Sequence, residues 1–206
     1  MKKTIKIYMA LFAITLFIAS CKKDDDSNNN TPTNCTNLTG WIRDGHKWVY
    51  SNEPILFFAD TLYVSCFSTS TQGVFRSEDL FDDGSFYPIY KSYTKPCGND
   101  LYSSSTEDMA NANIPYKLNG SIGNSWTSTT TTTLGYTATN TISIVAKNVS
   151  ITVPAGTFLC DKYHVISTSN QPGSITVTTD IYLNNDYGMI LTDGNTSHYE
   201  LVRKNF

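Results

Sequence analysis

The sequence predicts an all-β protein, in which an antiparallel meander of short strands curls into a half-barrel or open barrel, with a β-sandwich as the alternative. Three observations favour this fold class. Charged residues are scarce at 16 % and aromatic residues reach 13 %, and β-branched and aromatic side chains fit the pleated surface of a sheet. Apolar and polar residues alternate, most clearly over 149–153, as on a strand with one wet face. Turn-forming pairs such as Asp193-Gly194 separate the alternating segments.

The strand pattern recurs along the chain. Predicted strands cover residues 46–52, 55–58, 61–67, 73–76, 85–93, 125–134, 136–147, 149–153, 157–167, 174–183, 188–192 and 197–203. A turn at 82–84 separates two of these strands. Residues 93–114 are predicted to be irregular, because the segment contains Pro96, Gly98 and a run of serines. Within it, residues 105–112 are the one place where the sequence allows a short helix of one or two turns.

The first residues resemble a bacterial lipoprotein leader. A short basic start is followed by an apolar run over 5–19, which is too short for a comfortable transmembrane helix. The run ends in Ile18-Ala19-Ser20-Cys21, which resembles a lipobox, where cleavage leaves Cys21 to carry acyl chains such as palmitate. The alternative is a plain secretory signal that ends near a cysteine. We therefore expect a signal peptide over 1–20, a lipidated tether over 21–37 and a single β domain over 38–206.

The predicted tether is polar throughout. Residues 22–27 read Lys-Lys-Asp-Asp-Asp-Ser, which resembles the surface-export signal of lipoproteins in the Bacteroidetes. This resemblance implies an outer-membrane protein, anchored by lipid and exposed on the cell surface, whereas the alternative is a charged spacer facing the periplasm. Removing residues 1–20 takes away three of the 15 basic side chains and leaves all 18 acidic ones. An acidic chain without a basic cluster argues against nucleic acid as a partner.

Four cysteines follow Cys21, and an even number outside the cytoplasm permits two disulfides. Cys66 and Cys160 share strand faces with apolar residues, so we expect both to point inward. Cys35 and Cys97 lie in Asn-, Thr-, Pro- and Gly-rich surroundings, and we expect them to lie in loops. The sequence favours a Cys35–Cys97 disulfide, with Cys66 and Cys160 either bridged to each other or buried as thiols.

Four motifs, at residues 45–50, 123–126, 153–158 and 187–190, together resemble a family of bacterial secreted and lipid-anchored β proteins that carry a P-A-G-T-F motif. These resemble the TapB-like proteins and, more distantly, the half-barrels of lipoprotein carriers. The resemblance implies no catalytic residues. We expect a structural role for the motif residues, which are Trp48, Tyr50, Trp126, Pro154, Gly156, Phe158 and Gly188.

The sequence contains none of the common catalytic motifs, such as G-x-S-x-G, H-E-x-x-H, a P-loop or G-x-G-x-x-G. His46, His164 and His198 are scattered and lack partners at metal-ligand spacing. We therefore expect no metal, no cofactor and no enzymatic activity. An envelope hydrolase whose catalytic residues assemble from distant segments is the least favoured alternative.

Two functional hypotheses remain. In the first, a non-catalytic lipoprotein offers an apolar concavity to a lipid or another hydrophobic ligand. In the second, a surface module binds a glycan or an envelope protein, because 13 tyrosines suit stacking and hydrogen bonding to sugars. The position of the aromatic residues discriminates between them. Rings that line a cavity favour the first hypothesis, and rings exposed on a flat face or loop favour the second.

Asp60-Thr61-Leu62 resembles the O-glycosylation acceptor of the Bacteroidetes, so we predict that Thr61 carries a glycan in the native host. A mass increase on the peptide that contains Thr61 would support this prediction. An unmodified peptide from protein purified from that host would refute it.

Overall fold

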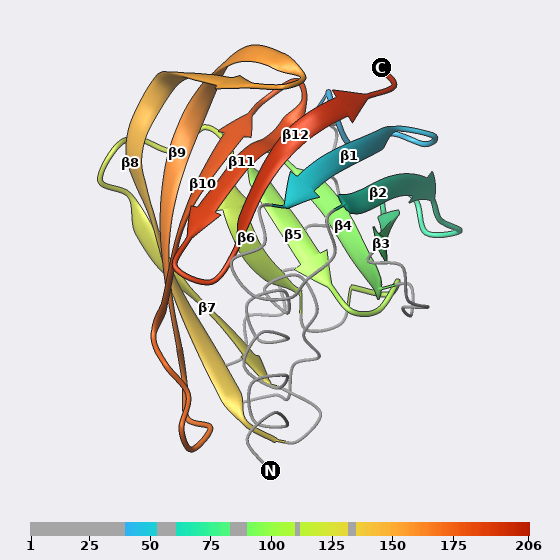
Figure 1. The fold of residues 1–206 in the computed structure, drawn as a ribbon. Coiled ribbons are helices and arrows are strands. Elements are labelled where there is room, and N and C mark those ends of the chain that lie inside the picture. Colours follow the sequence, from blue (N-terminus) through green and yellow to red (C-terminus); the bar gives the residue numbers. More distant parts are fainter. Residues whose placement is uncertain (1–39, 53–60, 83–89, 110–111, 132–134) are drawn as a thin grey trace.

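The structure is a computed structural model that describes residues 40–52, 61–82, 90–109, 112–131 and 135–206. In these residues twelve antiparallel strands form one sheet, and there is no helix (Figure 1). The strands are β1 (Lys47–Asn52), β2 (Thr61–Ser68), β3 (Phe75–Asp82), β4 (Tyr90–Cys97), β5 (Asp100–Ser104), β6 (Asn113–Lys117), β7 (Ser125–Thr131), β8 (Thr137–Val153), β9 (Gly156–Ser169), β10 (Val177–Asn184), β11 (Gly188–Gly194) and β12 (His198–Lys204). The all-β barrel prediction is confirmed, and the sandwich alternative is wrong.

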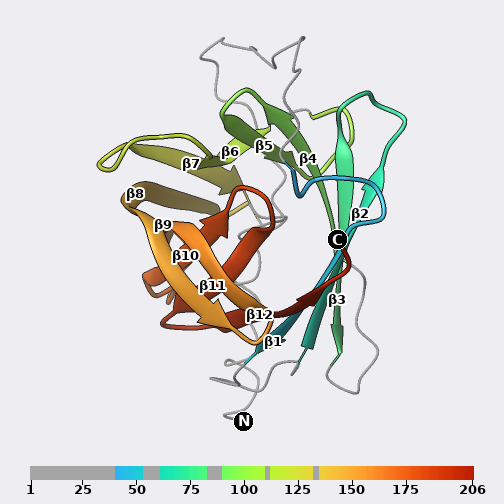
Figure 2. The same ribbon diagram turned by 90° about the horizontal axis from the view of Figure 1, so that it is seen from above.

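The sheet consists of two meanders of six strands each. Its order is β6-β5-β4-β3-β2-β1-β12-β11-β10-β9-β8-β7, so every pair of neighbours except β1 and β12 is consecutive in the chain. Seen from above, the strands form a ring in which β6 and β7 return to each other's side (Figure 2). These two strands are the ends of the hydrogen-bonded order. The sheet is therefore a nearly closed barrel with one seam.

The pairing of β1 with β12 joins the two meanders. It runs from Trp48 opposite Lys204 to Asn52 opposite Tyr199, with a bulge between Val49 and Tyr50. Asn205 extends the junction, because its side chain accepts a hydrogen bond from the Lys47 amide at 2.8 Å. Because the paired residues are far apart in the sequence, this junction closes the longest loop in the fold.

Side chains close the seam between β6 and β7. The indole Nε1 of Trp126 on β7 donates a hydrogen bond of 2.8 Å to the carbonyl oxygen of Ile114. The hydroxyl of Tyr163 on β9 donates one of 3.0 Å to the carbonyl oxygen of Lys117. The rings of Trp126 and Tyr163 also meet edge to face, with centroids 6.4 Å apart. Aromatic side chains thus supply the contacts that a strand ladder supplies elsewhere.

The inward faces of β8 and β9 form the packed part of the core. Their fully buried side chains include Ile144, Cys160 and Tyr163. The Val-Pro-Ala-Gly-Thr-Phe motif is the turn between these two strands, and the Ala155 amide donates a hydrogen bond of 3.1 Å to the carbonyl oxygen of Leu201 on β12. This turn therefore folds back over the barrel and covers one end of the core.

Residues 93–114 were predicted to be irregular, and this prediction is wrong. They contain the end of β4, all of β5 and the start of β6. Pro96 is tolerated because the ladder between β3 and β4 reaches only as far as Thr94, so Pro96 pairs with β5 alone. Gly98, with a φ of 60°, lies in the tight turn that follows β4. A proline and a glycine therefore mark the end of a strand here and not the absence of one.

The segment in which a short helix was allowed contains turns over its described residues. The Met109 amide donates to the carbonyl oxygen of Thr106, and the Ala112 amide donates to that of Met109. Met109 has a φ of 57° and a buried side chain, so a left-handed residue stops helical continuation. Residues 110–111, the predicted strand 55–58 and part of the predicted turn at 82–84 lie outside the described residues.

Residues 136–147 and 149–153, predicted as two strands, form the single strand β8. The register with β9 shifts between Ala146 and Val149, where Asn148 has a φ of 55°. Asp161 on β9 holds this bulge, because its carboxylate lies 3.2 Å from the Lys147 ammonium and accepts a bond of 3.3 Å from the Asn148 amide. The irregular pattern that suggested a break is a β-bulge.

Gly188→Ala should destabilise the fold more than Gly173→Ala. Both glycines have positive φ, 82° and 78° respectively, so each alanine carries a backbone cost of about 1–2 kcal/mol. A Cβ at Gly188 would lie 2.9 Å from the Trp41 ring, whereas a Cβ at Gly173 meets open space. Overpacking adds about 1 kcal/mol or more at Gly188. Urea unfolding of the two variants measures the difference, and equal losses would contradict the packing of Trp41 on this turn.

Candidate ligand-binding cavity

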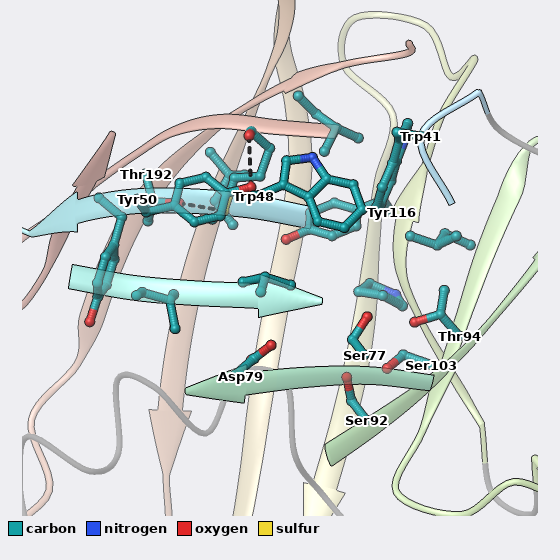
Figure 3. A pocket seen from close by; sticks show the side chains of 18 of the residues that line it. Trp41, Trp48, Tyr50, Ser77, Asp79, Ser92, Thr94, Ser103, Tyr116 and Thr192 are labelled. Atoms are coloured by element: carbon teal, nitrogen blue, oxygen red, sulfur yellow. Dashed lines mark hydrogen bonds between the residues drawn. The ribbon is translucent and has the colours of Figure 1, made fainter. Parts of the chain in front are cut away.

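A cavity of about 140 Å³ lies inside the barrel where the two meanders meet (Figure 3). Its lining residues come from β1 to β6, from β10 to β12 and from the segment that precedes β1. An engineered cavity of about 150 Å³ lined by Leu, Ile and Phe admits benzene. The cavity therefore has room for one group of about that size.

Two rings of β1 form the aromatic side of the cavity. The indole Nε1 of Trp48 donates a hydrogen bond of 2.9 Å to the carbonyl oxygen of Tyr187. The hydroxyl of Tyr50 donates one of 3.0 Å to the carbonyl oxygen of Met189 on β11. Because their polar atoms are satisfied by the opposite meander, both buried side chains present apolar ring faces to the cavity.

Further rings pack around Trp48. Trp41 meets Trp48 edge to face, with centroids 6.2 Å apart. The ring of Phe206 stacks on that of His46 with centroids 3.8 Å apart and meets Trp48 edge-on at 5.2 Å. The last residue of the chain thus packs on the start of β1, beside the same junction that joins the two meanders.

The opposite side of the cavity is polar, and we call it the polar wall. It consists of Ser77 and Asp79 on β3, Ser92 and Thr94 on β4, and Ser103 on β5. Cross-strand pairing places Ser77 directly opposite Ser92, and Thr94 directly opposite Ser103. Within the described part of the chain, none of the five side chains is hydrogen-bonded to another residue. The polar wall therefore offers a set of free oxygen atoms to the cavity (Figure 3).

Asp79 is the only charged residue among the described residues that line the cavity. Its side chain is half-buried and lines the cavity. Burial raises the pKa of this carboxyl from its ordinary value near 3.8 to about 7, because a low-dielectric site disfavours the charged form. Asp79 therefore changes charge close to neutral pH.

The other titratable groups of the cavity stay neutral in that range. Burial raises the pKa of the Tyr199 hydroxyl and of the Cys66 thiol, each to about 12. It also raises the pKa of the Tyr50 and Tyr116 hydroxyls, with a further contribution to Tyr50 from the nearby charge of Asp79. Between pH 5 and 8 the charge of the cavity is thus set by Asp79 alone.

The structure separates the motif residues that the sequence grouped together. Trp48 and Tyr50 line the cavity, whereas Trp126 and Phe158 pack in the core beside it. Pro154 and Gly156 lie at the tip of the β8–β9 turn, with a φ of 133° at Gly156. Gly188 starts β11 and lies against the ring of Trp41.

The cysteines have different environments. Cys66 and Cys160 are both buried free thiols, so in the structure they are not bridged to each other. Cys66 lines the cavity and Cys160 lies in the packed core. Cys97 was expected in a loop but is the last residue of β4, and it is disulfide-bonded. Cys35 lies outside the described residues, as does the lipidation site Cys21, so the Cys35–Cys97 pairing stays a prediction.

The hydroxyls and the carboxyl of the polar wall were missed by the sequence analysis. Ser77 and Asp79 alternate with Arg76, Glu78 and Leu80, so both faces of β3 contain polar residues and the pattern does not identify the inward one. The only local signal is the residue spacing of two, which places Ser77 and Asp79 on the same face. That this face is the inner one follows only from the pairing of β3 with its neighbours.

Thr61, the predicted glycosylation site, is the first residue of β2 and is half-buried. The three histidines are dispersed, with the Nδ1 atoms of His164 and His198 at 2.7 Å and 3.2 Å from the carboxylates of Asp180 and Asp193. Among the described residues no group of three or more His, Cys, Asp or Glu could hold a metal ion. No helix in that part of the chain is long and apolar enough to cross a membrane.

Two solved structures resemble this fold. A protein from Parabacteroides distasonis, provisionally described as a lipoprotein, matches with a TM-score of 0.50 and 16 % identity over 84 % of this chain and 100 % of that chain. A Bacteroides fragilis protein, provisionally described as exported and with a YmcC-like fold, matches with a TM-score of 0.48 and 11 % identity over 81 % and 98 % of the two chains. The first match supports the fold class.

No family model matches the sequence, and no curated protein matches it significantly. The P-A-G-T-F family therefore stays a resemblance.

Replacing Asp79 by Asn should stabilise the protein at pH 8 and have little effect at pH 4. The folded pKa of Asp79 lies above the unfolded value, so its contribution to stability is complete below about pH 4 and is lost as the pH rises toward 7. The full loss is on the order of 2–4 kcal/mol. Urea unfolding at several pH values measures it, with the exposed Asp186→Asn as control. A difference between wild type and Asp79→Asn that does not change with pH would contradict the raised pKa.

Proposed function

We propose that this protein is a non-catalytic, lipid-anchored lipoprotein of the outer membrane whose β domain binds a small, mostly apolar ligand inside the barrel. The observation that carries the proposal is the cavity at the junction of the two meanders. Aromatic rings line one side of it, and free oxygen atoms line the other. A concave, mostly apolar site with a few convergent polar groups is the usual form of a small-molecule site.

The positions of the aromatic residues favour ligand binding over a glycan-binding surface. Trp41, Trp48, Tyr50, Tyr116 and Tyr199 line the cavity. The large apolar side chains that are exposed in the described residues are all aliphatic. Among the described residues, the fully exposed side chains thus include no aromatic ring of the kind on which a glycan-binding module would stack its sugar.

The size of the cavity limits the ligand. Sites for drug-sized molecules usually measure about 300–1,000 Å³, and this one measures about 140 Å³. A single ring or a short alkyl segment fits, whereas a complete membrane lipid does not. The ligand class is therefore smaller than the lipid suggested by the resemblance to lipoprotein carriers.

The chemistry of the lining residues supports a non-catalytic role. The strongest nucleophile there is the Cys66 thiol, and burial raises its pKa to about 12, which keeps it protonated and unreactive at neutral pH. No histidine lines the cavity among the described residues to act as its base. Asp79 is a single carboxyl and lacks a partner for paired acid–base catalysis.

The anchoring part of the proposal rests on the sequence. Cys21 would carry the acyl chains and residues 22–37 would form the tether. The fold of the Parabacteroides protein, provisionally described as a lipoprotein, agrees with this proposal.

Toluene should stabilise the wild-type domain, and Val64→Phe should abolish this effect. Val64 lines the cavity, so a larger side chain there fills the space that the probe needs. At ten times the dissociation constant and pH 5.5, toluene should raise the melting temperature by roughly 3–5 °C.

The matched control is Val145→Phe on β8, because Val145 is exposed on the outside of the barrel. This variant should respond to toluene as the wild type does. Absence of any shift in the wild type, or an equal shift in Val64→Phe, would contradict binding in the cavity.

A further inference from the structure

The polar wall places hydrogen-bond acceptors where an apolar ligand alone would need none. Asp79 and the hydroxyl groups of Ser77, Ser92, Thr94 and Ser103 lie on the same side of the cavity, and the pair Ser77 and Ser92 is nearer to Asp79 along the strands than Thr94 and Ser103 are (Figure 3). Within the described part of the chain these groups have no hydrogen-bond partner in the protein, and an acceptor-rich wall of this kind is unnecessary for a purely apolar ligand. A ligand with a complementary polar group would satisfy them.

We infer that the cavity recognises a small primary amine, whose apolar body packs on Trp48 and Tyr50 and whose ammonium group donates hydrogen bonds to Asp79 and to the neighbouring hydroxyls of Ser77 and Ser92. This inference rests on the proposed function, because it names the chemical class of the ligand for the same cavity.

The charges of the cavity select the sign of the ligand. Its described lining residues include Asp79 and no lysine, arginine or histidine. A fatty acid or another carboxylate placed inside would face Asp79 without a compensating cation, which disfavours it strongly. An ammonium group instead forms a charge-assisted pair with Asp79, and hydrogen bonds of this kind are stronger than neutral ones.

The geometry of the polar wall fits the number of donors on an ammonium group. An ammonium ion has three N–H donors and no acceptor. The Asp79 carboxylate can accept one bond, and the cross-strand pair Ser77 and Ser92 lies two residues away on the same face. The rings of Trp48 and Tyr50 on β1 remain available to the apolar body of the ligand. The carboxylate and the two hydroxyls near it can thus accept the three hydrogen bonds of the ammonium group.

The pH dependence of binding separates an amine from a neutral ligand. The titratable groups that interact with the charge of Asp79 are Tyr50 on β1 and Tyr199 on β12, and Tyr116 on β6 and Cys66 on β2 line the same cavity. Burial holds the pKa of each of them far above neutrality, so only Asp79 titrates between pH 5 and 8. An amine binds more tightly as Asp79 ionises, whereas a neutral ligand binds more weakly.

The test is isothermal titration calorimetry with benzylamine, toluene and benzoate on the chain from Lys22 onward, which contains every strand of the sheet. Benzylamine should bind about tenfold or more tightly at pH 8 than at pH 5. Toluene should show the opposite trend, and benzoate should not bind. At pH 8 Asp79→Asn should weaken benzylamine about tenfold or more and leave toluene binding as tight or tighter.

The control variant is Asp186→Asn, which removes an exposed carboxyl outside the cavity and should bind all three probes as the wild type does. If toluene binds while benzylamine shows no preference and no dependence on Asp79, the amine inference is wrong and the proposed function stands. If neither toluene nor benzylamine binds, both are wrong.

Discussion

The pairing of the first strand with the last is the constraint on which the rest of the structure depends. β1 to β6 and β7 to β12 are two meanders of neighbouring strands, and only the ladder between β1 and β12 makes them one sheet. The cavity lies at this junction, because Trp48 and Tyr50 reach from β1 to carbonyl groups of Tyr187 and Met189 in the other meander. Loss of the β1–β12 ladder would therefore remove the cavity together with the barrel.

Local sequence patterns predicted the fold class and most of the strands, since alternation and turn residues act within a few positions of each other. They failed where the outcome depended on a neighbouring strand. Pro96 is accommodated because β3 does not pair with that part of β4, and Asn148 marks a bulge because Asp161 of β9 holds it. The cavity could be predicted only as an apolar concavity. Its polar wall depends on which face of β3, β4 and β5 turns inward, which long-range pairing decides.

Asp79 connects stability with recognition. A half-buried carboxyl without a partner among the described residues destabilises the folded state at neutral pH, because its charge loses part of its hydration. Hydroxyl groups on β4 and β5 and rings on β1 converge on the same space. A fold that needed only an inert core would gain from an apolar residue at this position. The loss of stability that a charged Asp79 causes is instead expected at a site that binds a hydrogen-bond-donating ligand, because binding sites often keep groups that destabilise the free protein.

The most direct test of a ligand site inside the barrel is the carboxyl-carbon NMR signal of Asp79, followed from pH 4 to pH 9 with and without benzylamine. Our account predicts a midpoint near pH 7 in the free protein and a clear fall in that midpoint when benzylamine is present. A midpoint near the ordinary value for aspartate, unchanged by benzylamine, would contradict both the buried carboxyl and its part in binding.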